Sequence, residues 1–122
     1  MWEILFWAYL VNAVLLINHE IDSAYWQEWE LFHLPGGITG FLLLHFPLLF
    51  LILYGLVLVY QQAFGGLVVS LLLSLGGLFA FSIHTFFVRR GREEFKSPLS
   101  RFILVGTLMV SLVQAGITVY LL

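Results

Sequence analysis

The stretch Asn18-His-Glu-Ile-Asp-Ser-Ala-Tyr-Trp-Gln-Glu-Trp-Glu-Leu-Phe-His33 is the main polar segment of an otherwise apolar chain. It holds two of the four histidines and four of the seven carboxylates. Long apolar runs lie on both sides of it, so it separates the first hydrophobic segment from the second. We therefore expect the chemistry of this protein in this segment or directly beneath it.

The composition of the chain predicts an integral membrane protein. Of its 122 residues, 61% are hydrophobic and only 10% are charged, whereas a soluble domain is roughly half apolar and about a quarter charged. The absence of cysteine excludes disulfides, iron–sulfur clusters and thiolate sites. A net charge of −2 argues against nucleic acid as a partner. The length suits one domain, residues 1–122.

Four apolar runs are long enough to cross a bilayer, which takes about 17–25 helical residues. Backbone groups in hydrocarbon must be hydrogen-bonded within their own segment, so these runs are predicted to be helices rather than strands. The expected fold is an all-α, integral membrane four-helix bundle. Its spans are expected at about residues 2–18, 38–60, 67–88 and 101–122.

The cationic residues predict the orientation of the bundle. All five lie between the third span and the start of the fourth: Arg89, Arg90, Arg92, Lys96 and Arg101. Loops rich in Lys and Arg stay in the cytoplasm, so this basic loop is predicted to be cytoplasmic. The first connection then shares that side, and both termini face outward. We expect a multi-pass protein of the inner (cytoplasmic) membrane.

Aromatic residues alternate with polar ones in the first connection: Tyr25, Trp26, Trp29 and Phe32. Such rings favour the headgroup region, where one side of the ring is wet. An amphipathic helix lying along the membrane interface is therefore predicted between the first and second spans.

Three histidines are predicted to lie at one depth in the cytoplasmic quarter of the membrane. His19 ends the first span, His45 lies about 10 Å into the second at 1.5 Å per residue, and His84 is one turn from the end of the third. Ionisable residues within spans are rare and are functional candidates by default. His84 has an alternative interpretation, contact with lipid headgroups, so His19 and His45 are the first choices.

A polar site is predicted around these histidines. On the first helix Asn12, His19 and Asp22 share one face, and on the third Gly76, Ala80 and His84 stack, with small residues that favour close helix packing. The predicted polar or ligand site comprises Asn12, His19, Glu20, Asp22, His45 and His84.

The same residues could hold a metal. His19, Asp22, His45 and His84 offer only nitrogen and oxygen ligands, which suit zinc, iron or manganese, and Glu20, Glu28 or His33 are further candidates. No multi-histidine metal motif is present, and paired histidines could equally hold a haem. The histidines could instead bind a proton or solute, or only form structural hydrogen bonds. The sequence leaves these alternatives open, and no nucleophile is indicated.

The run His19-Glu-Ile-Asp-Ser-Ala-Tyr-Trp-Gln-Glu-Trp-Glu-Leu-Phe-His-Leu-Pro-Gly-Gly37 resembles the signature of a family of small, uncharacterised bacterial membrane proteins with four spans. The resemblance covers roughly the first half of the chain. It implies a four-helix membrane bundle and no particular activity or functional residue.

Three functions are compatible with these features. The favoured one is a membrane protein whose polar site binds or conducts an ion, a proton or a small solute. The alternatives are a metal- or haem-dependent membrane enzyme at the cytoplasmic face and an accessory subunit of a larger membrane complex. Whether the chain is an enzyme is left open. The lipid bilayer, and either a homo-oligomer or a larger complex, are the expected partners.

Overall fold

The computed structural model describes residues 1–91 and 97–122. The regular structure of these residues is entirely helical: α1 (Trp2–Tyr25), α2 (Glu28–Leu31), α3 (Gly37–Tyr60), α4 (Phe64–Arg89) and α5 (Pro98–Leu121). All but α2 are long and apolar enough to cross a membrane. The predicted all-α membrane bundle is confirmed, and the chain is a multi-pass membrane protein.

The polar segment begins as helix. α1 continues to Tyr25, well beyond its predicted end near residue 18, so His19 and Glu20 lie on a regular helical turn. The chain then reverses direction through residues with positive φ, Gln27 (55°), His33 (55°) and Gly36 (92°). The four-residue helix α2 lies between the first two of these reversals. The connection is thus a compact turn rather than a long amphipathic helix.

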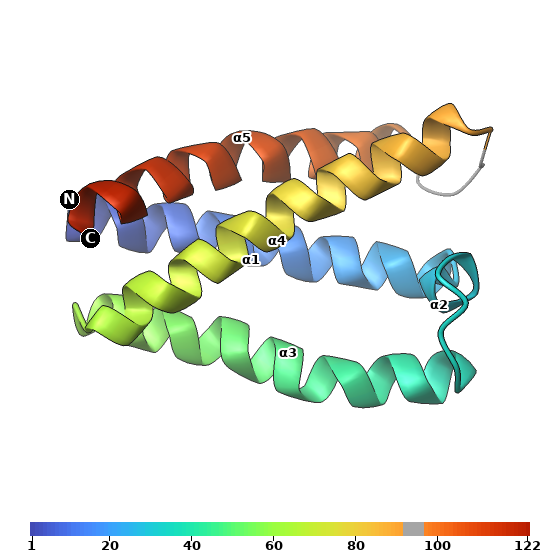
Figure 1. The fold of residues 1–122 in the computed structure, drawn as a ribbon, viewed down its shortest axis with the longest axis horizontal. Helices are drawn as coiled ribbons and strands as arrows, with labels where there is room; N and C mark the ends of the chain where they lie inside the picture. The colour runs from blue at the N-terminus through green and yellow to red at the C-terminus, as the bar shows by residue number, and fades with distance from the viewer. Residues whose placement is uncertain (92–96) are drawn as a thin grey trace.

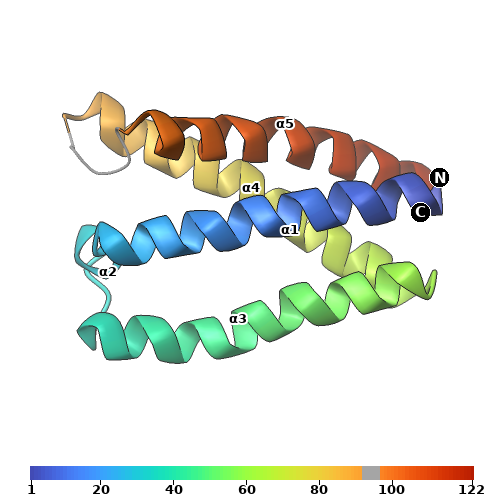
Figure 2. The ribbon, with the colours of Figure 1, turned by 180° about the vertical axis from the view of Figure 1, so that it is seen from behind.

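The four long helices do not run parallel to one another. α4 crosses the bundle obliquely, lying beside α3 near the connection at residues 61–63 and beside α5 at its other end (Figure 1). α1 packs against both α3 and α5, as seen from the opposite side in Figure 2. The chain termini lie at one end of the bundle and α2 at the other. Consequently α3 and α4 diverge toward the α2 end.

Two adjacent glycines of α4 show which face of this helix is tightly packed. A Cβ atom on Gly77 would collide with the side chain of Ser111 on α5, whereas one on Gly76 would meet nothing within 4 Å. The sequence predicted close packing at Gly76, and this was wrong by one residue. Glycine at 77 allows the close approach of α4 and α5, while Gly76 faces open space.

A buried polar network joins α1, α4 and α5 in the middle of the bundle. The amide of Asn12 donates hydrogen bonds to Gln114 Oε1 (2.7 Å) and Ser111 Oγ (3.1 Å). Gln114 Nε2 donates in turn to Ser70 Oγ (2.9 Å), and Ser70 bonds Thr118 (2.8 Å). Because polar groups in hydrocarbon need partners, these bonds hold the three helices in one register.

Candidate functional site

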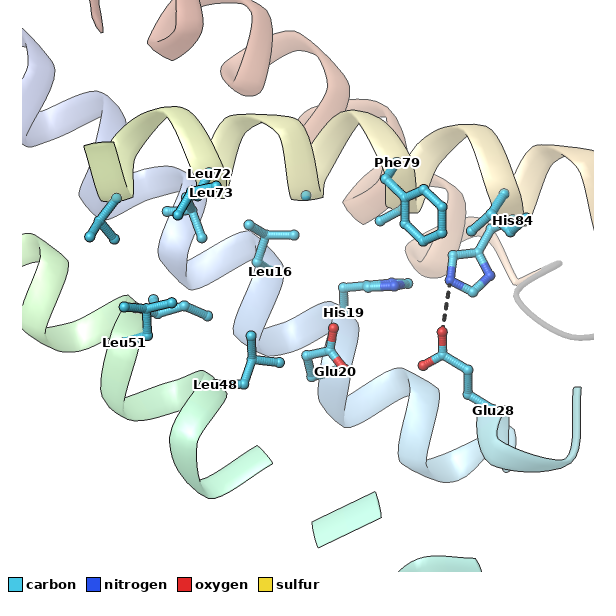
Figure 3. A pocket seen from close by; sticks show the side chains of 15 residues that line it. Leu16, His19, Glu20, Glu28, Leu48, Leu51, Leu72, Leu73, Phe79 and His84 are labelled. Carbon is cyan, nitrogen blue, oxygen red and sulfur yellow. Dashed lines mark ion pairs between the residues drawn. The ribbon is translucent and has the colours of Figure 1, made fainter. Parts of the chain in front are cut away.

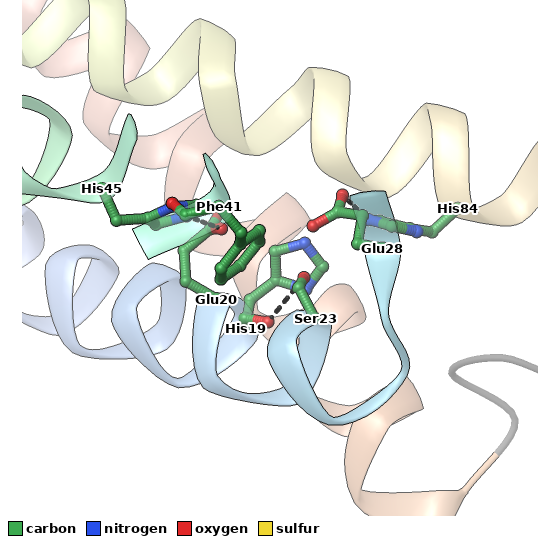
Figure 4. A network of polar contacts seen from close by, with 7 residues as sticks. All are labelled: His19, Glu20, Ser23, Glu28, Phe41, His45 and His84. Carbon is green, nitrogen blue, oxygen red and sulfur yellow. Dashed lines mark hydrogen bonds and ion pairs between the residues drawn. The ribbon is translucent and has the colours of Figure 1, made fainter. Parts of the chain in front are cut away.

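Three helices and the short α2 bring a cluster of histidines and carboxylates to one end of the bundle. His19 and Glu20 come from α1, Glu28 from α2, His45 from α3 and His84 from α4 (Figure 4). The cluster consists of two groups, a His45–Glu20 pair and a His19–Glu28–His84 triad.

The His45–Glu20 pair links α3 to α1. His45 Nδ1 lies 2.6 Å from the backbone carbonyl oxygen of Phe41, and Nε2 lies 2.5 Å from Glu20 Oε2. A carbonyl oxygen only accepts hydrogen bonds, so Nδ1 carries a proton and donates it. Nε2 therefore either donates to an ionised Glu20 or accepts from a protonated one. In both forms the pair shares one proton and has no net charge.

The triad is more deeply buried. His19 and His84 are 2% and 1% exposed, respectively, and their rings make an edge contact with centroids 4.6 Å apart. His84 Nε2 lies 3.4 Å from Glu28 Oε1. One donor atom from each of the three residues lies within 4.8 Å of the other two. Two imidazole nitrogens and a carboxylate oxygen thus converge on one point.

Local backbone geometry explains why Glu28 reaches the histidines. α1 ends at Tyr25. Gln27 then reverses the chain, with a φ of 55°, so that α2 begins next to the end of α1. Few residues other than glycine adopt this left-handed conformation, and Gln27 is one of them. The reversal carries the Glu28 carboxylate back over His19 and His84, as Figure 4 shows.

The environment of Glu28 favours its ionised form. Burial by itself raises the pKa of this carboxyl. Hydrogen bonds from His84 and Ser23, together with the nearby charges of His84 and His19, outweigh burial and lower the pKa below its usual value. An ionised carboxylate between two imidazoles is the form that a metal cation requires.

The structure places the remaining predicted site residues elsewhere. Asn12 belongs to the mid-bundle network, about 10 Å along α1 from His19 at 1.5 Å per residue. Asp22 accepts a hydrogen bond from Trp26 Nε1 at 3.0 Å, and His45 pairs with Glu20. Of the four predicted metal ligands, only His19 and His84 therefore meet in the triad. His84 is buried and does not face the headgroups.

The four aromatic residues predicted at the interface divide into two pairs. Tyr25 is exposed and its ring contacts Trp26. Trp29 packs on Phe41 of α3, and Phe32 packs on His84 and Phe87 of α4. Phe32 therefore contacts the triad through His84, and Trp29 joins α2 to α3. The interfacial position of Tyr25 and Trp26 stays a prediction.

The basic residues lie near the same end of the bundle. Arg89 ends α4, Arg90 follows it and Arg101 lies in the first turn of α5. The guanidinium of Arg90 lies 4.8 Å from the ring centroid of Phe86. The other two residues of the predicted basic loop, Arg92 and Lys96, lie outside the described residues.

A cavity of about 390 Å³ adjoins the triad between α1, α3 and α4 (Figure 3). His19, Glu20, Glu28 and His84 form its polar end, and the rest of its wall is apolar. Volumes of about 300–1,000 Å³ are typical of small-molecule sites. The triad thus has an open side, and that side faces an apolar space.

The sequence did not single out Glu28 as a ligand. It named Glu28 only among further candidates, because residues 19 and 28 do not share a helical face. Gln27 is not one of the residue types that dominate turns, so no sequence signal marked the reversal that brings Glu28 to the histidines.

Comparisons with known proteins agree with the predicted resemblance in part. A sequence model of DUF6713, described as a family of unknown function, matches residues 5–121. No curated protein and no solved structure matches the chain.

Proposed function

The chain belongs to DUF6713, a family of unknown function, and from the geometry of its buried triad we propose that it is a membrane protein that binds one divalent transition metal ion. His19, Glu28 and His84 are the proposed ligands. The observation that carries this proposal is the convergence of their three donor atoms within 4.8 Å in a buried position.

The donor set fits a first-row metal. Zinc binds imidazole nitrogen and carboxylate oxygen at about 2.0–2.2 Å in tetrahedral geometry, so two ligand atoms of one ion lie about 3.4 Å apart. The donor atoms, which lie within 4.8 Å of one another, need to approach by up to about 1.4 Å, which rotations of the side chains provide. Two histidines and one carboxylate with open positions also form the ligand set of non-haem iron(II) sites.

A haem is a poorer fit. The rings of His19 and His84 touch edge to face with centroids 4.6 Å apart. A porphyrin held between two axial histidines needs its plane between the two rings, and this contact leaves no room for it. A metal ion needs only the point at which the three donor atoms converge.

Three protein ligands favour a reactive metal over a structural one. Structural zinc is closed by four protein ligands, whereas catalytic zinc keeps a position for water or substrate. Here the position left open faces the cavity, whose wall also contains Glu20. The favoured function is therefore ligand binding at a metal ion. Conduction is less well supported, because the mid-bundle polar groups from Asn12 to Thr118 bond one another.

Elemental analysis of the protein purified in mild detergent without chelators tests this proposal. We expect close to one equivalent of zinc, iron or manganese per chain. His19→Ala, Glu28→Gln and His84→Ala should each lower the affinity for that metal by at least about tenfold, since each removes one of three ligands. His33→Ala is the matched control, because His33 is exposed and outside the triad. A wild-type chain that takes up none of these metals, even after loading, would contradict the proposal.

A further inference from the structure

The cavity beside the triad is a long groove along one face of α4. Its wall on this helix extends from Val69 to His84 at helical spacings, a length of about 20 Å at 1.5 Å per residue. Half of the hydrocarbon core of a bilayer measures about 15 Å. The groove is therefore long enough for the hydrocarbon chain of a lipid from one leaflet.

The groove opens sideways, toward the region that lipid chains occupy. Leu48 and Leu51 of α3, and Leu72 and Phe79 of α4, line the cavity and are also 37–65% exposed. All four lie within helices long enough to span the membrane, so their exposed surface faces hydrocarbon. α3 and α4, which carry these four side chains, diverge toward the α2 end of the bundle (Figure 1). An occupant would enter from the bilayer.

The net charge at the polar end of the groove determines which charge the head group of the occupant should carry. A divalent ion with neutral His19 and His84 and an ionised Glu28 carries a net charge of +1. Glu20 does not cancel this charge, because it is already balanced by His45. A net charge beside an apolar cavity is costly unless it is paired. A single negative charge on the head of the occupant would neutralise it.

We propose that the groove binds one long-chain fatty carboxylate from the bilayer, with its chain along α4 and a carboxylate oxygen as the fourth ligand of the metal. This inference rests on the metal site proposed above. Carboxylate oxygen is an ordinary ligand of zinc, and one acyl chain is an apolar group that a groove of this length and of about 390 Å³ accommodates. Without the metal, the ionised Glu28 would face the head with negative charge, so binding requires the metal.

The experiment measures binding of radiolabelled palmitate to the full chain in detergent, with and without one equivalent of zinc. Hexadecanol, which has the same chain and a neutral head, is the control for the head. We expect palmitate to bind the zinc-loaded protein in a 1:1 ratio, and to bind the zinc-free protein at least about tenfold more weakly. Hexadecanol should bind weakly to both forms.

A glycine substitution tests the groove separately from the metal. Gly76 lines the cavity, and a Cβ there meets no atom within 4 Å, so Gly76→Leu fills the groove without disturbing helix packing. It should weaken palmitate binding by about tenfold or more and leave zinc binding unchanged. Gly116→Leu is the matched control, because Gly116 of α5 also has open space and is outside the cavity. Leu51→Trp narrows the groove from α3 and should reproduce the loss.

The outcomes separate the two proposals. A chain that binds no metal overturns both. A chain that binds zinc but not palmitate overturns the fatty-carboxylate site alone. The fatty-carboxylate site is also overturned if palmitate binds equally well with and without zinc, or if hexadecanol binds as tightly as palmitate. It is overturned as well if Gly76→Leu and Leu51→Trp both bind palmitate as tightly as wild type.

Discussion

Glu28 shows how much one residue contributes to the buried triad. It lies in the shortest helix, and its carboxylate provides the negative charge between two buried histidines. Without it, His19 and His84 would be two imidazoles in edge contact, with two nitrogen donors and no oxygen donor. The ionisation of Glu28 therefore contributes to the stability of this end of the bundle and to the proposed metal site.

The lowered pKa of Glu28 predicts how the stability of the metal-free protein depends on pH. Ionised Glu28 stabilises the folded state. This contribution is complete above the ordinary carboxyl pKa of about 4.3 and is lost as the pH falls through the lower value in the folded protein. Thermal unfolding between pH 3 and 7 should show less acid destabilisation for Glu28→Gln than for wild type. The exposed Glu30→Gln is the control and should behave like wild type. An unchanged acid limb in Glu28→Gln would contradict this account.

Two neighbouring glycines predict opposite effects of the same substitution. Gly77→Ala inserts a methyl group against Ser111 and should lower the free energy of unfolding by about 1–3 kcal/mol, as overpacking does. Gly76→Ala meets open space and should raise it by up to about 1 kcal/mol, because alanine favours helix. Unfolding of both variants in the same detergent measures the difference. Equal effects would contradict the assignment of the packed face.

At the scale of helices, the mid-bundle network sets how α1, α4 and α5 fit together. Its hydrogen bonds connect the amide of Asn12 through Gln114 to Ser70 and Thr118. The network lies apart from the histidine cluster, so its role is in assembly of the bundle. It gives α1 a fixed register, and that register determines the depth at which His19 and Glu20 lie.

Loss of Asn12 should therefore destabilise the bundle. Asn12→Ala removes the partner of Gln114 Oε1 and Ser111 Oγ, and we expect a loss of about 1–2 kcal/mol of unfolding free energy. Asn18→Ala on the same helix is the matched control, because Asn18 is exposed and its amide donates to the carbonyl of Val14 in its own helix. Comparable losses in the two variants would show that the interhelical bonds contribute little.

At the scale of the whole molecule, the predicted orientation places the triad at the cytoplasmic side. The triad, Arg89 and Arg101 lie at the α2 end of the bundle, and the uncharged turn containing Gln62 lies at the other. The positive-inside rule then assigns the α2 end to the cytoplasm. A fatty carboxylate in the groove would be drawn from the inner leaflet.

The absence of cysteine makes this orientation directly testable. His33→Cys and Gln62→Cys each introduce a single thiol in an exposed turn at opposite ends of the bundle. In intact cells a membrane-impermeant maleimide should label the variant at position 62, and the variant at position 33 should be labelled only after lysis. The reverse pattern would place the triad on the outer side.

The sequence by itself determined the class of fold, because a bilayer permits only internally bonded helices for four long apolar runs. It also identified His19, His45 and His84 as buried candidates, since charged and ionisable residues in spans are rare. The sequence did not determine which of these histidines lie next to one another. Helical periodicity relates residues only within one helix, so it does not predict the chain reversal at Gln27 or the oblique crossing of α4. Those two tertiary features bring Glu28 and His84 over His19, pair His45 with Glu20, and leave Asn12 and Asp22 with other partners. The cavity beside the triad has the same origin, because residues of four different helices line it together.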